Sequence, residues 1–207
     1  ILNTCLICSQ NLSFHCIIKK CQKIKEIKIN EKGEILIIAE KTINYYTTET
    51  RNTRLDDLLV FKIDSNSNFI WSTEISKKQK GSEMRFGHHT KRVGTGSEST
   101  FVITESHEEL TSFVSFWIKD RIFILYNEHP AKFEGKNDYA FFQGMKGNVV
   151  IIEIDKKGDL SKNLFYTNKK QTMFLIPSGC KKVGENQINL LWIPRRSSNC
   201  QISKLAF

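Results

Sequence analysis

The chain has 207 residues, of which 40% are hydrophobic and 26% are charged, as in ordinary globular proteins. No apolar run approaches the roughly 18 to 20 residues that a membrane-spanning helix needs, and the composition excludes extensive disorder. The net charge is +9, but most lysines are spread over predicted turns and solvent-facing positions. Their one local concentration consists of Lys19, Lys20, Lys23, Lys25 and Lys28. This spread argues against nucleic acid as a partner.

Residues 1–23 form a cysteine-rich segment that fits none of the repeated units in the rest of the chain. Its cysteines follow the spacing C-x2-C-x7-C-x4-C and are Cys5, Cys8, Cys16 and Cys21. A C-x2-C pair can supply two zinc ligands, although this spacing is not that of a standard zinc finger. Disulfides would require an oxidising compartment, and free thiols are the third alternative. All three stay open, and the sequence predicts neither a metal nor a cofactor.

Apolar residues alternate with polar ones from residue 24 onward, which is typical of β-strands. Residues 34–40 (EILIIAE), 57–64 (DLLVFKID) and 69–75 (FIWSTEI) read as strands. The last two are joined by Ser65-Asn66-Ser67-Asn68, which are good turn residues, so they predict a hairpin. We therefore expect a first unit at 24–75, followed by a glycine-rich connection at 77–110.

Two further units show the same pattern. The second, at 112–166, contains predicted strands at 113–117, 121–127, 148–155 and 160–166. The third, at 172–207, contains predicted strands at 172–176, 180–183, 187–193 and 201–207. With four sequence-adjacent antiparallel strands in each unit and few helical stripes, the predicted fold class is all-β.

Two segments carry a resemblance to a known architecture. In Asp57 to Trp71 and in Asp155 to Tyr166, an apolar strand ends in Ile-Asp, passes through a polar turn and returns as an apolar strand. This pattern resembles the outer hairpin of bacterial β-propeller repeat proteins. The resemblance implies about three blades of a partial propeller. Because propellers have 4–8 blades, it also implies missing upstream blades of the same protein as partners.

The chain begins with Ile1 instead of methionine, so we expect it to be a piece of a longer protein. A removed signal peptide would leave no trace in it. We expect the cell envelope or the extracellular space over the cytoplasm.

Several carboxylates lie near predicted strand ends and could face the mouth of a propeller. They are Asp56, Asp57, Glu128, Glu134 and Asp138. Two such groups converging on one pocket would suit a glycoside hydrolase or a lyase. The sequence does not bring any two of them together, so no catalytic residue is assigned. Nucleotide-binding and nucleophile-elbow motifs are absent from the sequence.

Two other features resemble metal sites, namely the run Asp64 to Asn68 and the histidines, but neither has the full set of residues that a metal site requires. The run Asp64 to Asn68 begins like a calcium loop, but Phe69 replaces the required glycine and Ile75 replaces the closing glutamate. We therefore interpret this run as a turn. The five histidines lack helical ligand spacing, and they are His15, His88, His89, His107 and His129.

The aromatic residues suggest a core more strongly than a binding surface. Trp71, Trp117 and Trp192 each lie in a predicted strand, where packing between blades explains them, and a ligand-binding rim is the alternative. Because no catalytic constellation is visible, we expect a non-enzymatic interaction module that binds a protein, a peptide or a glycan. The propeller hydrolase or lyase is the alternative function.

Overall fold

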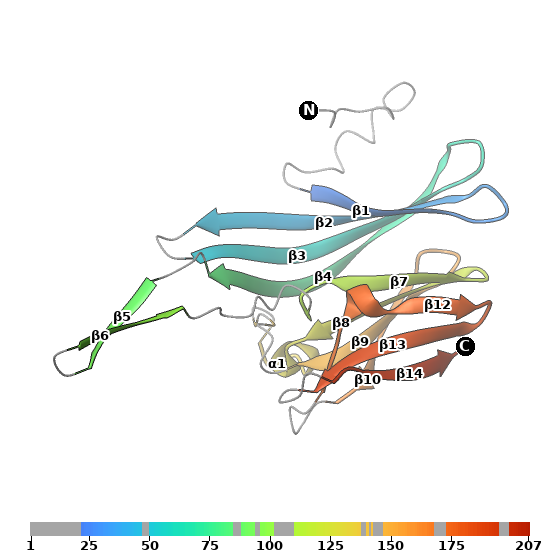
Figure 1. The fold of residues 1–207 in the computed structure, drawn as a ribbon. Coiled ribbons are helices and arrows are strands. Elements are labelled where there is room, and N and C mark those ends of the chain that lie inside the picture. Colours follow the sequence, from blue (N-terminus) through green and yellow to red (C-terminus); the bar gives the residue numbers. More distant parts are fainter. Residues whose placement is uncertain are drawn as a thin grey trace.

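The structure is a computed structural model that describes residues 22–46, 50–84, 88–93, 96–101, 110–137, 140, 142, 147–167, 173–194 and 199–207. Most of these residues lie in three four-stranded antiparallel sheets (Figure 1). This confirms the prediction of an all-β chain built from repeated four-stranded units. In the described part of the chain, no helix is long and apolar enough to cross a membrane.

Sheet 1 contains the first four strands in sequence order. They are β1 (Gln22–Ile29), β2 (Ile35–Tyr46), β3 (Thr50–Ile63) and β4 (Phe69–Met84). The predicted hairpin is confirmed, since β3 pairs with β4 and Ile63 lies opposite Phe69. However, β4 continues nine residues beyond the predicted end at Ile75. At the start of this extension the inward positions hold the polar residues Lys77 and Gln79, both fully buried, so hydropathy alone gives no sign of the strand there.

The glycine-rich connection contains a hairpin of its own. Its strands are β5 (His88–Val93) and β6 (Gly96–Phe101), which pair with each other in a two-stranded sheet. In Figure 1 this hairpin projects to the left, away from the three larger sheets.

Sheet 2 contains β7 (Phe113–Ile118), β8 (Arg121–Glu128), β9 (Asn148–Ile154) and β10 (Leu160–Tyr166), again paired in sequence order. The short helix α1 (Pro130–Phe133) follows β8. His129 caps it, because the imidazole Nδ1 accepts the Ala131 N–H at 3.2 Å and Pro130 starts the first turn.

Sheet 3 departs from a simple meander. Its strands are β11 (Met173–Leu175), β12 (Lys181–Gly184), β13 (Gln187–Pro194) and β14 (Gln201–Ala206). Both β11 and β12 pair with β13, and β14 pairs with it as well, at the register Gln187 opposite Ala206. Between β11 and β12 the chain forms a 3-10 turn at Pro177–Gly179. Proline lacks the N–H that a continuous strand would donate.

Three hairpin turns share one construction. Asn30, Asp64 and Asp155 each accept two main-chain N–H groups through one side-chain oxygen, at 2.8 to 3.0 Å, from the residues two and four positions later. The fourth residue of each turn has a positive φ, and these residues are Gly33 (75°), Ser67 (69°) and Gly158 (89°). The two Ile-Asp turns noted in the sequence are therefore real repeats, and the Asn30 turn is a third copy.

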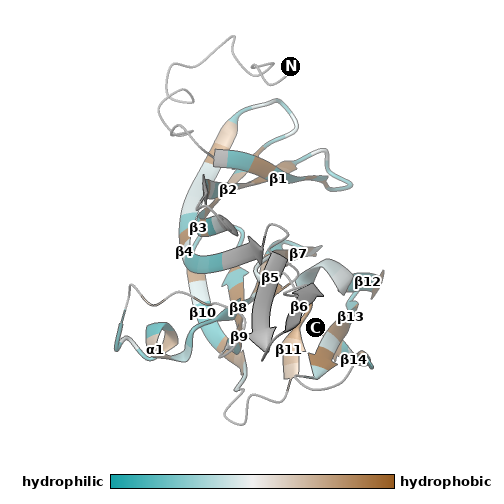
Figure 2. Ribbon diagram, turned by 60° about the vertical axis from the view of Figure 1, so that its left-hand side comes forward, coloured by the Kyte–Doolittle hydropathy of each residue, from teal (hydrophilic) through white to brown (hydrophobic). Residues whose placement is uncertain are grey.

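Two apolar cores hold the sheets together, and Figure 2 shows hydrophobic (brown) and hydrophilic (teal) residues mixed along the strands. Between sheets 1 and 2 the core includes Leu36, Ile38, Leu58, Val60, Trp71, Ile122, Ile124 and Ile152. Between sheets 2 and 3 it includes Val114, Phe116, Phe123, Leu125, Leu175, Ile188, Leu190 and Trp192. Alternation along the strands places a third buried cluster on the opposite face of sheet 1: Ile37, Ala39, Leu59, Phe61 and Ile63.

Two amide side chains, those of Asn127 and Gln79, link the three sheets at their junction. The Asn127 side-chain NH₂ donates to the carbonyls of Leu110, at 3.0 Å, and Leu175, at 2.8 Å. The Gln79 side chain, from sheet 1, donates to the Asn127 carbonyl at 2.7 Å. All three bonds are buried, where an unpaired polar group would cost about 1–3 kcal/mol.

Candidate functional site

A groove of about 940 Å³ runs between the three sheets and is lined by β1, β7 and β12 with the turns that adjoin them. This volume is at the upper end of typical ligand sites. We call it the first-strand groove, because β1 and β7 are the first strands of their sheets and β12 shares the leading edge of sheet 3 with β11. Its charged residues are evenly divided in sign, and they are Glu26, Lys28, Glu31, Lys32, Lys119, Asp120, Lys182 and Glu185.

Residues from sheet 1 reach across the groove to β7. The Lys28 ammonium donates to the Ser115 hydroxyl at 2.5 Å and also to the Ser115 carbonyl. It forms an ion pair with Glu26 at 3.1 Å, and Glu26 in turn accepts the Ser115 hydroxyl. At the rim, Lys32 pairs with Asp120 at 3.2 Å, although both side chains are exposed, so this pair adds little stability.

Trp117 is the half-buried tryptophan of this groove. Its ring packs against the core between sheets 1 and 2, and the Lys62 ammonium lies 5.5 Å from the ring centroid. Lys62 is itself buried and pairs with Glu34 at 2.9 Å. That hydrogen bond lowers the pKa of the Glu34 carboxyl. On the other side of Trp117, Lys182 from β12 donates to its carbonyl at 3.4 Å.

A smaller cavity of about 390 Å³ lies beside the start of β1 and β7. Glu40, which is 1% exposed, lines it and pairs with Lys25 at 3.1 Å and with the fully buried Lys77. Lys77 also donates to the Thr111 carbonyl at 3.2 Å, and its ammonium lies 5.5 Å from the Phe113 ring centroid. Burial lowers the pKa of Lys77 to about 8, although Glu40 opposes this effect.

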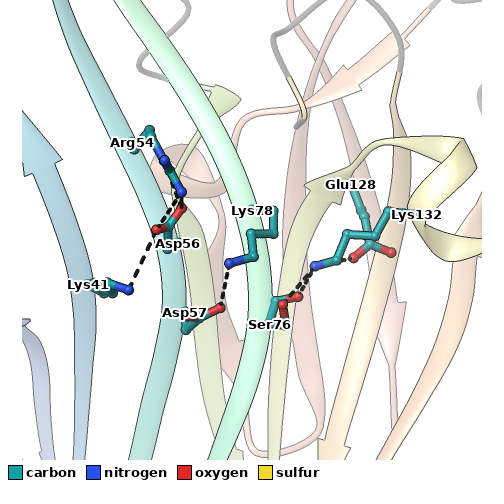
Figure 3. Close-up of polar contacts among 8 residues, drawn as sticks. All are labelled: Lys41, Arg54, Asp56, Asp57, Ser76, Lys78, Glu128 and Lys132. Carbon is teal, nitrogen blue, oxygen red and sulfur yellow. Dashed lines mark hydrogen bonds and ion pairs between the residues drawn. The ribbon is translucent and has the colours of Figure 1, made fainter. Parts of the chain in front are cut away.

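The candidate carboxylates are placed with cations, not with one another (Figure 3). The buried Asp56 pairs with Arg54 at 3.0 Å and with Lys41 at 3.9 Å. Asp57 pairs with Lys78 at 3.6 Å. The ion-pair partners of Asp56, Asp57 and Glu128 are thus lysine or arginine. Asp138 lies outside the described residues.

Glu128 is the most deeply buried carboxylate of this set. It is fully buried and pairs with Lys162 at 2.6 Å and with Lys132 at 3.5 Å. The Tyr126 hydroxyl donates to it at 3.4 Å, and burial raises the pKa of that phenol well above its ordinary value. Lys132 also donates to Ser76 of β4, so this cluster joins sheets 1 and 2. Glu134 pairs with Lys136 at 2.6 Å.

Two of the three tryptophans are core residues, as the packing interpretation predicts. Trp71 is buried between sheets 1 and 2 and donates to the Lys156 carbonyl at 3.1 Å. Trp192 is buried between sheets 2 and 3 and donates to the Ser203 hydroxyl at 2.8 Å.

The structure describes some of the residues in the two patterns that resemble metal sites. Asp64 accepts main-chain N–H groups in its turn, as expected. Among the described residues, no three His, Cys, Asp or Glu side chains gather as a metal site. Cys180 is buried and Cys200 is exposed, both as free thiols. The four cysteines of the amino-terminal segment lie outside the described residues, as do His15 and His107 and the side chains of His88 and His89.

Sequence reasoning missed the groove because its residues do not form a motif. Ser115 and Trp117 occupy alternate positions in an apolar strand, and Lys28 is one of many lysines. One signal was available in the sequence. If the predicted four-strand units pack on one another as sheets, the first strands of these units lie on the same side of the packed sheets. No family model, curated protein or solved structure matches the chain.

Proposed function

We propose that the chain is a non-enzymatic interaction module that binds a peptide segment of a partner protein in the first-strand groove. The observation that carries the proposal is the groove itself, which joins all three sheets and combines exposed charges of both signs with strand edges. Charges of both signs suit the mixed side chains of a peptide, and strand edges suit its main chain.

The local environment of the groove favours a peptide over the other classes. A glycan site would need an open aromatic face, whereas Trp117 packs against the core and has Lys62 near its ring. A hydrolase or lyase would need a pair of carboxylates on one pocket, whereas Asp56, Asp57 and Glu128 are each neutralised by lysine or arginine.

We further propose that the three sheets are consecutive blades of a β-propeller, with the groove on the side of its central axis. Two observations support this arrangement. The leading strands β1, β7 and β12 line the same groove, as inner strands of blades would. The face of sheet 1 turned away from sheet 2 is apolar and buried, as in a blade with both faces covered. Because propellers have 4–8 blades, we propose upstream blades of the same protein as further partners.

Selection from a phage-displayed peptide library on the whole chain tests the binding function. The groove variant is Lys32→Glu, and the matched control is Lys157→Glu. Lys32 and Lys157 occupy the same position in two turns of the same construction, but only Lys32 lines the groove. We expect selected peptides to bind Lys32→Glu at least tenfold more weakly and to bind Lys157→Glu as they bind the unmodified chain.

Two results would overturn the proposal. One is that no selected peptide distinguishes the two variants, which would place binding elsewhere. The other is that a glycan array, and not the peptide library, yields ligands whose binding depends on Lys32.

A further inference from the structure

We propose that the partner segment binds as an added β-strand along the free edge of β7, an inference that rests on the proposed function of the groove. β7 is an outer strand of sheet 2, since the order of that sheet is β10-β9-β8-β7. In the described part of the chain, β8 is the only strand that pairs with β7. Its other edge is the part of sheet 2 that lines the groove.

The register of the β7–β8 hairpin fixes which main-chain groups face outward. Ile118 lies opposite Arg121 across the two-residue turn Lys119-Asp120, and Lys119 has φ +54°, as a tight hairpin turn requires. The pair that closes such a turn exchanges both main-chain hydrogen bonds, and the pairs then alternate. Ser115 and Trp117 therefore belong to the pairs that do not bond across to β8. Their N–H and C=O groups point away from β8 toward the groove.

The lysine contacts agree with this assignment. The Ser115 carbonyl accepts the Lys28 ammonium from sheet 1, and the Trp117 carbonyl accepts the Lys182 ammonium from sheet 3. Two of the outward acceptors of the edge, those of Ser115 and Trp117, are thus held by side chains from the neighbouring sheets. An added strand would supply main-chain N–H donors at the same two positions, and the two lysines would release them to solvent.

Lysine on an edge strand is also a known device against unwanted pairing between chains. Removal of the ammonium groups has a different effect in each of the two roles. If the two ammonium groups compete with a bound strand for the Ser115 and Trp117 carbonyls, removing them strengthens peptide binding. If they only protect the edge, their loss produces self-association without any gain in peptide binding. Methionine has a similar length and no N–H donor, so Lys28→Met with Lys182→Met separates the two roles.

The experiment uses the strongest peptide selected on the whole chain. Each of its residues is N-methylated in turn, which removes one main-chain donor at a time, and the dissociation constant is measured by isothermal titration calorimetry. We expect alternate positions to lose at least tenfold in affinity, because every second residue of an added strand bonds to β7. We expect the double methionine variant to bind the unmodified peptide several-fold more tightly.

The outcomes separate the inference from the proposed function. Uniform tolerance of N-methylation, combined with weaker binding to Lys32→Glu, would leave the groove as the site and overturn strand addition. Self-association of the double methionine variant with unchanged peptide affinity would overturn it too. Amide exchange gives an independent check: the Ser115 and Trp117 N–H groups should become protected when peptide binds, and lack of protection there contradicts the inference.

Discussion

Ser67 is the one non-glycine residue among the fourth positions of the three matched turns. Its φ of 69° lies in the left-handed region, which costs an L-amino acid about 1 kcal/mol. Gly33 and Gly158 hold the equivalent positions without that cost. We expect Ser67→Gly to raise the free energy of unfolding by about 0.5–1 kcal/mol, since glycine's greater freedom in the unfolded chain offsets part of the relief. Urea denaturation measures the change.

Gly158 provides the reciprocal substitution. A Cβ at this position would lie 2.9 Å from atoms of the Trp71 ring, in addition to requiring the same left-handed backbone. Gly158→Ser should therefore destabilise the protein by more than Ser67→Gly stabilises it. A lower urea midpoint for Ser67→Gly would show that the hydroxyl of Ser67 makes a contribution larger than its backbone strain.

Substitution of Trp71 tests how much one core side chain contributes to the stability of the protein. It is buried between sheets 1 and 2 and its indole N–H donates to the Lys156 carbonyl. Truncation of such a residue costs about 3–5 kcal/mol. We expect Trp71→Ala to destabilise by that amount and the exposed neighbour Ser72→Ala to change stability by less than about 0.5 kcal/mol.

Lys62 lies on the same hairpin but is an unsuitable surface control, because it is buried and pairs with Glu34. Equal urea midpoints for Trp71→Ala and Ser72→Ala would contradict the assignment of the indole to the core.

At the scale of elements, the end of β4 is stabilised by polar side chains. Lys77 has a pKa of about 8 because burial disfavours its ammonium form, whereas the unfolded chain keeps a pKa near 10.5 at this position. Between pH 8 and about 10 the unfolded chain therefore binds more protons at Lys77 than the native protein does. Under this condition, stability rises with pH. We expect the free energy of unfolding of the native sequence, relative to that of Lys77→Met, to increase across this window.

Chemical denaturation at pH 7, 8, 9 and 10 provides the measurement. Lys78→Met is the matched control, since the adjacent lysine is only half-buried and pairs with Asp57. Tyr126 acts in the opposite direction above pH 10, because its raised pKa keeps a proton that the unfolded chain loses, and this effect cancels in the comparison. A difference between the native sequence and Lys77→Met that stays constant with pH would contradict the lowered pKa of the buried Lys77.

The elements also show what the sequence could and could not reveal. Regular alternation found the strands of sheet 2 to within one residue and placed the turn between β3 and β4, but it missed the first seven residues of β3. It missed the extension of β4, because Lys77 and Gln79 occupy inward positions that only their buried partners make favourable. It also missed the groove, since the contacts of Lys28 with Ser115 join residues 87 positions apart. Long-range pairing of that kind leaves no local pattern.

For the whole molecule, the central position of sheet 2 predicts an uneven distribution of local stability. Sheet 2 packs against sheet 1 on one face and against sheet 3 on the other, and β8 contributes to both cores. By contrast, β14 has one strand neighbour in its sheet, and its Ile202 side chain is 68% exposed. Hydrogen exchange followed by mass spectrometry should show the slowest amides in β8 and β9 and the fastest strand amides of sheet 3 in β14. Slower exchange in β14 than in β8 would contradict this order.

The bonds of Asn127 have a consequence for the order in which the protein folds. Each sheet is made of strands that follow one another in sequence. The four strands of sheet 1 can therefore complete their pairing before sheet 2 has been synthesised. The Gln79 bond to Asn127 spans 48 residues, and so does the Asn127 bond to Leu175. The second bond must wait until the ribosome has released the start of sheet 3. Until then the Asn127 amide lacks one of its two acceptors, so we expect assembly to proceed from the amino terminus and the junction to be completed late.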